Sequence, residues 1–309
     1  MTKAVVFAYH NVGVRCLSVL LAHGVDVRLV VTHTDNPKET IWFDSVAELA
    51  ERHDIPVITP DDPNIPEAIE KIRALQPDFL FSFYYRNMLE KEILEIPLRG
   101  AFNMHGSLLP KYRGRVPVNW AIIKGETETG ATLHVMNEKP DNGAIVDQQA
   151  VPILPDDTAL EVFHKVTCAA EIALDRCLPS LFAGTAQLKS QDLSLGGYFG
   201  GRRAEDGKIH WDQAARDIHN LVRAVAPPYP GAFTQLAGKP MRVLKTMQEP
   251  SRPVRGMIPA FYCDNGRCYA QCGDGKVLRV LAFEWDGQEL SAEEFTARFG
   301  SEPQPFEYF

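Results

Sequence analysis

Two polar side chains, Asn103 and His105, carry the clearest chemical signal in the sequence. They lie two positions apart at the end of a predicted strand, so both side chains leave the sheet on the same face and can contact one ligand. An amide beside an imidazole suits acyl transfer to an amine. The amide can stabilise the oxyanion by about 2.7 to 4 kcal/mol, and the imidazole, with a reference pKa of about 6.5, can take the proton from the attacking nitrogen.

A carboxylate would orient that imidazole and stabilise its charged form, and Asp141 is the candidate. It lies in the loop of residues 139–143, between two further predicted strands. Taken singly, an Asn-x-His pair or an Asp before Asn-Gly is also what an ordinary turn contains. The prediction of a catalytic trio therefore depends on the joint context of the three residues.

The elements that must position these residues alternate along the first half of the chain, as a parallel sheet covered by helices requires. Buried or alternating β-rich runs predict strands at residues 4–9, 26–32, 56–58, 78–84, 100–104, 130–136 and 144–151. Helical patterns occupy residues 14–23, 45–53, 66–75, 118–124 and 158–182. In parallel sheets ligands gather at the carboxyl ends of strands, where Asn103 and His105 lie. We therefore predict an α/β fold with a Rossmann-like, mostly parallel sheet and helices on both faces.

The 309 residues of the chain exceed the length at which a single core stops growing, so two domains are expected. We predict a catalytic domain over residues 1–188, a glycine-rich linker over 189–205 and a C-terminal domain over 206–309. The last contains a helix at residues 211–225, short strands between turns, and a final helix that begins with a capping box of Ser291 and Glu294. A small, OB-like β-barrel is the predicted architecture of this domain.

Bulk composition argues against several classes of partner. The formal net charge is −8, whereas a nucleic-acid-binding protein needs clustered Lys and Arg, so no nucleic acid is expected. The first residues turn polar too soon for a signal peptide, and no apolar run approaches the roughly 20 residues that span a bilayer. We therefore expect a cytoplasmic protein without a membrane span that acts on small molecules.

The six cysteines are scattered, and a cytoplasmic setting keeps thiols reduced, so no disulfide framework is expected. Cys263, Cys268 and Cys272 could be imagined as three zinc ligands. They contain no C-x-x-C pair, however, and the glycines around them indicate hairpin turns. We predict no metal.

Other enzymes with a similar sheet have signatures that this sequence lacks. A dinucleotide-binding dehydrogenase needs G-x-G-x-x-G after the first strand, whereas residues 9–13 are YHNVG. There is no P-loop, and Ser107 does not lie in a G-x-S-x-G elbow. Hydride transfer, phosphoryl transfer and serine hydrolysis therefore have no support from motifs.

In its motifs the chain resembles the formyltransferases that use N10-formyltetrahydrofolate. The shared signature is an Asn-x-His pair, a Ser-Leu-Leu-Pro loop and, downstream, an Asp before a glycine and a strand start. Here these are Asn103, His105, residues 107–110 and Asp141. The likeness extends over nearly the whole chain, as far as residues 223–225 and 230–233. It implies N10-formyltetrahydrofolate as co-substrate and Asn103, His105 and Asp141 as the catalytic residues.

Within that family, the segments VVFAYH, THTDNP, FSFYYR, NMHGSLLPKYRGRVPVNW and GETETGATLH are most similar to the formyltransferase domain that acts on UDP-4-amino-4-deoxy-L-arabinose in lipid A modification, a route to antibiotic resistance. The resemblance implies transfer to the 4-amine of a nucleotide-linked amino sugar. The folate contacts that it implies are Asn87, Met88, Leu89, Arg115, Asn137, Glu138, Lys139 and Pro140. The substrate contacts that it implies are Tyr85, Ser107, Lys111 and Arg113.

Alternatives stay open at this stage. A methionyl-tRNA formyltransferase would share the architecture and the trio, but residues 34–43 contain only Lys38 as a cation, and residues 206–309 contain 12 Lys and Arg against 13 Asp and Glu. A glycinamide ribonucleotide transformylase would leave the second domain unexplained. A catalytically silent folate-binding regulator is disfavoured by the intact trio.

The enzyme with the most similar motifs is fused to a decarboxylating dehydrogenase domain, whereas this chain ends at Phe309. We therefore expect a separate dehydrogenase chain in the pathway. The nucleotide base, the exact amino sugar and the oligomeric state, a homo-oligomer included, are left open by the sequence.

Overall fold

The computed structural model describes residues 1–37 and 39–307, and the chain divides into two compact units. The N-terminal unit comprises Met1–Pro117, Glu128–Pro152 and Phe163–Gly200. The C-terminal unit comprises Val118–Thr127, Ile153–Val162 and Gly201–Phe309. Two short segments from the middle of the chain thus group with the second unit. The domain limits expected from sequence stay a prediction, and Lys38, the cation singled out above, lies outside the described residues.

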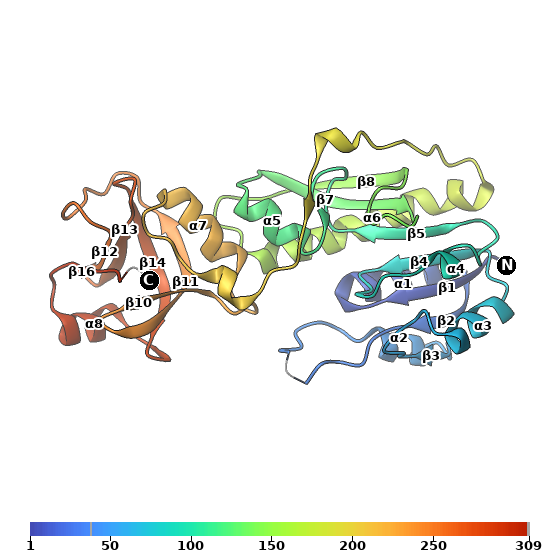
Figure 1. The fold of residues 1–309 in the computed structure, drawn as a ribbon, viewed down its shortest axis with the longest axis horizontal. Coiled ribbons are helices and arrows are strands. Elements are labelled where there is room, and N and C mark those ends of the chain that lie inside the picture. Colours follow the sequence, from blue (N-terminus) through green and yellow to red (C-terminus); the bar gives the residue numbers. More distant parts are fainter. Residues whose placement is uncertain (38, 308–309) are drawn as a thin grey trace. The chain divides into compact units, whose positions relative to one another are not determined.

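A seven-stranded sheet organises the N-terminal unit (Figure 1). Its order is β3-β2-β1-β4-β5-β7-β8; the pairs among the first five strands are parallel, whereas β7 runs antiparallel to β5 and to β8. The bounds are β1 (Lys3–Ala8), β2 (Asp26–Val31), β3 (Val57–Ile58), β4 (Phe79–Phe83), β5 (Ala101–His105), β7 (Glu128–Val135) and β8 (Ile145–Pro152). The predicted mostly parallel sheet is confirmed, and its one departure is this antiparallel edge.

Helices cover both faces of this sheet, because the central strands are apolar on both sides. On one face Val5 and Phe7 of β1 share a buried cluster with Ile72 of α3. On the other face α1 packs along α6, and Arg15 and His23 of α1 pair with acidic residues of α6. The helices of this half of the chain are α1 (His10–Ala22), α2 (Val46–Arg52), α3 (Pro66–Ala74), α4 (Lys91–Leu94), α5 (Pro117–Ile123) and α6 (Ala159–Ala183).

The C-terminal unit is built on an antiparallel sheet of order β10-β11-β14-β13-β12-β16, with β15 paired to β14. An isolated bridge between Leu236 of β10 and Phe306, next to β16, joins the two ends, so the sheet curls into the predicted small barrel. The bounds are α7 (Ala215–Ala224), β10 (Ala232–Leu236), β11 (Lys239–Gln248), β12 (Ala260–Asp264), β13 (Arg267–Gln271), β14 (Val277–Trp285), β15 (Gln288–Glu289), α8 (Ala292–Phe299) and β16 (Gln304–Pro305).

The first helix of the C-terminal unit is shorter than predicted. The sequence pattern predicts it from Trp211, whereas α7 begins at Ala215. Trp211 is instead a core residue: its ring stacks on Phe306 at 3.8 Å, and its indole N–H donates to Thr234. Burial of a large aromatic ring in the barrel outweighs the helical pattern at these positions.

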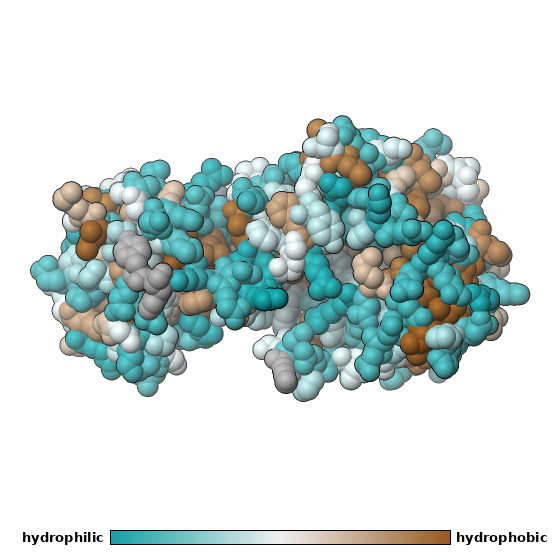
Figure 2. Space-filling model, in the orientation of Figure 1, coloured by the Kyte–Doolittle hydropathy of each residue, from teal (hydrophilic) through white to brown (hydrophobic). Residues whose placement is uncertain are grey.

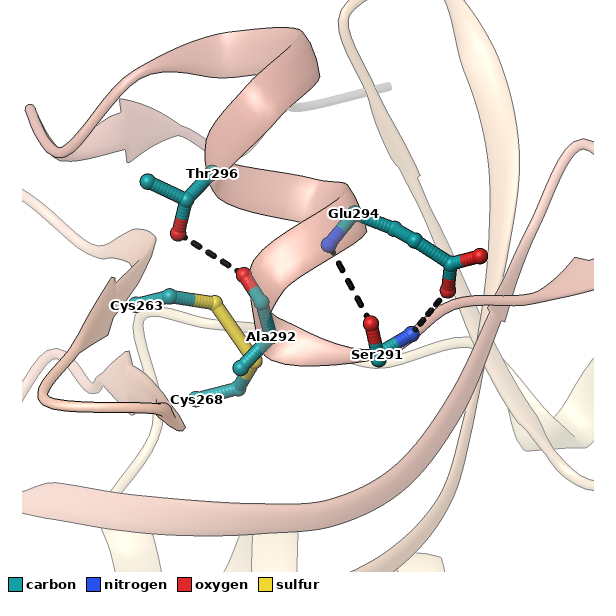
Figure 3. Close-up of a disulfide and its surroundings, with 6 residues drawn as sticks. All are labelled: Cys263, Cys268, Ser291, Ala292, Glu294 and Thr296. Carbon is teal, nitrogen blue, oxygen red and sulfur yellow. Dashed lines mark hydrogen bonds between the residues drawn. A yellow bond between two sulfur atoms is a disulfide. The ribbon is translucent and has the colours of Figure 1, made fainter.

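The expectation that all six cysteines stay unpaired is wrong, because Cys263 and Cys268 form a disulfide (Figure 3). The two residues lie directly opposite each other in the β12–β13 hairpin, so strand register alone brings the sulfur atoms together. The cluster considered for zinc therefore consists of one disulfide and the buried thiol of Cys272. The hairpin lies beside α8, whose predicted capping box is confirmed: Glu294 N–H donates to Ser291 Oγ, and Ser291 N–H donates to Glu294 Oε2.

The face of the molecule drawn in Figure 2 is mostly hydrophilic and carries scattered apolar patches. Among the described residues, no helix is both long enough and apolar enough to cross a membrane.

Two short strands complete the N-terminal unit. β6 (Arg113–Gly114) pairs in parallel with β9 (Tyr198–Phe199), and a one-turn 3-10 helix occupies Leu193–Leu195. A second 3-10 helix, Ala204–Gly207, belongs to the C-terminal unit. Residues 189–200, which the sequence analysis assigns to a linker, therefore take part in the fold of this unit.

Candidate active site

The predicted catalytic residues converge at the last strand of the parallel series. Asn103 and His105 lie at the carboxyl end of β5, and the antiparallel register places His134 of β7 directly opposite Asn103. Asp141 comes from the β7–β8 loop. Its Oδ1 atom lies 3.4 Å from Nδ1 of His105 and 3.5 Å from Nε2 of His134. The structure thus brings together the amide, the imidazole and the carboxylate expected from sequence, and it adds a second imidazole.

Hydrogen bonding fixes the tautomer of His105. Nε2 lies 2.8 Å from the carbonyl oxygen of Tyr112, which only accepts, so Nε2 carries the proton. The neutral ring then holds its lone pair on Nδ1, the nitrogen beside Asp141. Burial lowers the pKa of His105, and the Asp141 carboxylate and the Tyr112 carbonyl oppose that shift. At neutral pH the ring is therefore an uncharged base with a carboxylate placed to stabilise the cation that it forms.

Asp141 keeps its charge although only 10% of its side chain is exposed. Burial alone would raise its pKa, but the neighbouring imidazoles of His105 and His134 and the Gly114 N–H, which donates to Oδ2 at 2.8 Å, together lower the pKa to about 2. The residue has a φ of 56°, a left-handed conformation that side chains other than glycine seldom adopt. Such a conformation persists where the surrounding contacts hold it, so these contacts set the direction in which the carboxylate points.

His134 was not among the site residues expected from the sequence. Its Nδ1–H donates to the carbonyl of Val135 at 2.8 Å, so its Nε2 accepts from the amide of Asn103 at 3.1 Å. That contact orients Asn103 with its nitrogen toward His134 and leaves the second amide N–H for a ligand. A period-2 alternation in GATLH was visible in the sequence, but the strand opposite β5 and its direction were not.

The loop after β5 is held by side chains of the antiparallel strands. Thr132 Oγ1 donates to the carbonyl of Ser107 and accepts from Leu109 N–H, and Gln148 donates to the carbonyl of Leu109. Ser107 is fully buried, and its hydroxyl donates to the carbonyl of Lys111 at 2.6 Å. In this arrangement Ser107 shapes the loop, and its expected contact with substrate stays a prediction.

The three cations of that loop have different surroundings. The guanidinium of Arg113 donates to Asn142 and to the carbonyls of Leu193 and Gly196. Lys111 and Arg115 are exposed. Substrate contact by Lys111 and Arg113, and folate contact by Arg115, stay predictions. The structure gives Arg113 an additional role in holding residues 189–200.

The two segments with the remaining implied folate contacts lie beside each other. Lys91, just after residues 87–90, pairs with Glu138 of the β7–β8 loop at 3.2 Å. Leu89 belongs to a buried apolar cluster against which Tyr85 and Met136 pack. Of the other residues, Met88, Asn137, Glu138 and Lys139 are exposed, and Asn87 and Pro140 are half-buried. These two segments thus offer both buried apolar side chains and exposed residues, and the second of them contains Asp141.

Tyr85 marks this region as one that suits a ligand. Its ring stacks on His33 at 4.2 Å, and burial raises the pKa of its hydroxyl to about 12. The hydroxyl oxygen is buried and has no hydrogen-bond partner among residues 1–37 and 39–307. A buried hydroxyl without a protein partner is a position where a ligand or water is expected to bond. Within the same described residues, no group of three His, Cys, Asp or Glu side chains is arranged to hold a metal ion.

Solved structures share this fold. An N-formyltransferase from Helicobacter canadensis, in complex with folinic acid and dTDP-3-aminofucose, has 22% sequence identity and a TM-score of 0.72 over 94% of this chain and 100% of its own. WlaRD, a sugar 3N-formyl transferase with dTDP and 5-N-formyl-THF, has 21% identity and a TM-score of 0.70 over 94% and 98%. HypX from Aquifex aeolicus, with tetrahydrofolic acid, has 15% identity and a TM-score of 0.62 over 99% of this chain and 50% of its own.

Family models agree with the fold. The model of the formyl transferases matches residues 14–178, more than half of the chain, and that of the formyl transferase C-terminal domain matches residues 202–300. The matched regions contain the Asn103, His105 and Asp141 cluster and the barrel, respectively. The chain therefore belongs to the formyl transferase family.

Proposed function

We propose that this formyltransferase transfers the formyl group of N10-formyltetrahydrofolate to the 4-amine of a nucleotide-linked amino sugar, with UDP-4-amino-4-deoxy-L-arabinose as the acceptor. The observation that carries the proposal is the convergence of Asn103, His105 and Asp141 beside the segments implied to contact folate. Cytoplasmic action and a separate dehydrogenase chain are part of the same proposal, on the strength of the motif resemblance.

The side chains of the trio have complementary tasks in this reaction. The formyl donor supplies an electrophilic carbon. Asn103, oriented by His134, offers its second N–H to the negative charge that develops on the carbonyl oxygen. His105 takes the proton of the attacking amine at Nδ1, because Nε2 already donates to Tyr112. Asp141 stabilises the resulting imidazolium across 3.4 Å, and the proton can then pass to the leaving nitrogen of the folate.

Several features support the reduced folate as donor. The apolar side chain of Leu89 and the exposed Met88, both implied folate contacts, lie on the segment whose Lys91 pairs with Glu138 of the β7–β8 loop. The orphan hydroxyl of Tyr85, implied as a substrate contact, lies just before that segment in the chain. A pterin ring needs both apolar contact and hydrogen-bond partners, and irregular backbone beside an apolar cluster offers both. The Helicobacter canadensis enzyme and WlaRD were solved with folinic acid and 5-N-formyl-THF, respectively.

The acceptor class has support from the same two structures, which carry dTDP-3-aminofucose and dTDP. The choice of UDP-4-amino-4-deoxy-L-arabinose depends on the motif resemblance alone. The C-terminal unit gives no support to a tRNA acceptor, because its residues 206–309 contain one more acidic than basic side chain.

A panel of acceptors tests the proposal. The purified protein is given N10-formyltetrahydrofolate with UDP-4-amino-4-deoxy-L-arabinose, with dTDP-linked 3-amino and 4-amino sugars, and with methionyl-tRNA. Formylated products are detected by mass spectrometry, and UDP-L-arabinose, which has a hydroxyl in place of the amine, is the matched negative control. The expected result is a formamide product and release of tetrahydrofolate with the UDP-amino sugar.

Each other outcome overturns a defined part of the proposal. Product only with a dTDP-amino sugar keeps sugar formylation and removes the UDP-4-amino-4-deoxy-L-arabinose assignment. Product only with methionyl-tRNA removes the sugar acceptor altogether. Tight folate binding without turnover of any acceptor would identify a silent regulator.

A further inference from the structure

Residues 189–200 form a strap across the loops that carry the active-site side chains. At the start of the strap, Lys189 pairs with Ile145, the first residue of β8, through two backbone hydrogen bonds. At its end, β9 pairs with β6. Between them, Gly196 approaches the backbone of Pro110 so closely that a Cβ atom there would overlap the carbonyl oxygen. The strap therefore follows the loop after β5 and the loop before β8 at backbone distance.

One strap side chain, Gln191, bonds two backbone carbonyls of the left-handed turn at Asp141. Its amide nitrogen donates to the carbonyl of Asp141 at 2.9 Å and to the carbonyl of Gly143 at 2.7 Å. Both donors of the amide are thus directed to one turn. A Cβ at Gly143 would overlap the carbonyl oxygen of Val135, so the turn is also closed from the β7 side.

We propose that Gln191 is a positioning residue that holds the Asp141 turn in the conformation that directs the carboxylate to His105. Three observations carry the inference: the double donation by Gln191, the left-handed φ of Asp141, and the strap's attachment on either side of Gln191. The inference rests on the role proposed for Asp141 in the reaction.

Loss of the Gln191 donors has a defined consequence. Two carbonyls would lose these hydrogen bonds, and the cost of a left-handed non-glycine residue would no longer be offset at that turn. The carboxylate would spend less time within reach of His105. Burial and His134 lower the pKa of His105, whereas Asp141 raises it. A withdrawn carboxylate therefore leaves the pKa of His105 lower than in the wild type.

The test compares Gln191→Met with Gln187→Met. Methionine keeps the length of the side chain and removes the amide. Gln187 lies in the segment just before the strap, and its exposed amide donates to the carbonyl of Thr185 at 3.4 Å. The pKa of His105 is followed through the ring 15N chemical shifts of histidine-labelled protein, assigned with His105→Gln. Acceptor turnover and thermal unfolding are measured on the same samples.

We expect Gln191→Met to lower the pKa of His105 and to reduce kcat by about 10 to 10²-fold, as a small displacement of a catalytic group does. Gln187→Met is expected to change neither. In the double variant Gln191→Met/Asp141→Asn, the pKa of His105 should equal that of Asp141→Asn alone, because Gln191 acts through the carboxylate.

Two outcomes overturn the inference. A lower melting temperature with an unchanged pKa of His105 would make Gln191 merely structural, and additive pKa changes in the double variant would show that it does not act through Asp141. An unchanged pKa of His105 in Asp141→Asn would instead contradict the role proposed for Asp141 itself. The failure of the inference and the failure of the proposed reaction are therefore separate results.

Discussion

Two buried histidines, one in each unit, differ in what their ring nitrogens face. His219 of α7 donates from Nε2 to the carbonyl of Pro155 at 3.0 Å, and its Nδ1 lies 2.8 Å from the hydroxyl of Thr246. His105 likewise donates from Nε2 to a carbonyl, but its Nδ1 faces the carboxylate of Asp141 at 3.4 Å. Burial lowers the pKa of both rings.

The comparison teaches that burial alone does not identify a reactive histidine. At His219 both nitrogens have protein partners, and together with the buried Arg223, which donates to the carbonyls of Leu154 and Asp157, the ring ties residues 153–162 to α7. At His105 the lone pair points to a group that can stabilise a positive charge. The first arrangement stabilises a fold, whereas the second prepares a proton transfer.

The largest effect is expected at the active centre. His105→Ala should lower kcat by 10²-fold or more, because a general base contributes about 10² to 10⁴. Asp141→Asn should also lower kcat by at least about 10²-fold, through loss of the charge that stabilises the imidazolium. Steady-state kinetics with the accepted amino sugar measure both variants, and circular dichroism checks the fold. Near-normal turnover of either folded variant would contradict the assigned role.

A smaller effect of a different kind is expected at His219. His219→Leu leaves the hydroxyl of Thr246 and the carbonyl of Pro155 without a buried partner, at a cost of about 1 to 3 kcal/mol in the free energy of unfolding. Urea unfolding measures this loss, and kcat per folded molecule should stay within about twofold of the wild type. A loss of kcat comparable with that of His105→Ala would erase the distinction between the two histidines.

A third effect concerns the dependence of stability on pH. The pKa of His10 is lowered to about 3 and that of His33 to about 4, mainly by burial, so both folded-state values lie below the reference of 6.5. The unfolded chain therefore binds these protons first, and stability that is present above pH 6.5 is lost as the pH falls toward 4. Each such histidine contributes at most about 1.4 kcal/mol per pH unit.

His10→Phe separates this contribution from the rest, because His10 already stacks on Phe43 at 4.0 Å among other aromatic rings. The variant should lose less stability than the wild type between pH 6.5 and pH 4 in urea unfolding at a series of pH values. An unchanged pH dependence would show that His10 is not among the groups that resist protonation.

Periodicity, motif spacing and their joint context predicted that Asn103, His105 and Asp141 come together, because a period of two sets the face of a strand and Asp-Asn-Gly marks a turn. The catalytic roles of the three residues stay predictions. The same patterns were not sufficient for His134 and Gln191. His134 lies opposite Asn103 because β7 runs antiparallel to β5. Gln191 reaches the Asp141 turn from a segment without regular secondary structure. Both depend on pairings between distant segments that no local pattern encodes.

The same reason accounts for the disulfide. Glycine positions predicted the turn between Cys263 and Cys268, but the pairing of the sulfur atoms follows from the hairpin register, in which the two residues face each other. In contrast, the Ser291 and Glu294 capping box is a purely local device and was predictable in full.

The β7–β8 loop spans β5 from one end to the other. It starts level with the amino end, where Met136 N–H donates to the carbonyl of Ala101, yet its Asp141 reaches His105 at the carboxyl end. One stretch of chain thus serves both as a border of the candidate active site and as a tether of fixed length for the carboxylate. Insertions or deletions here would change that border and the reach of Asp141 together, so this loop is expected to tolerate exchanges of side chains more readily than changes in length.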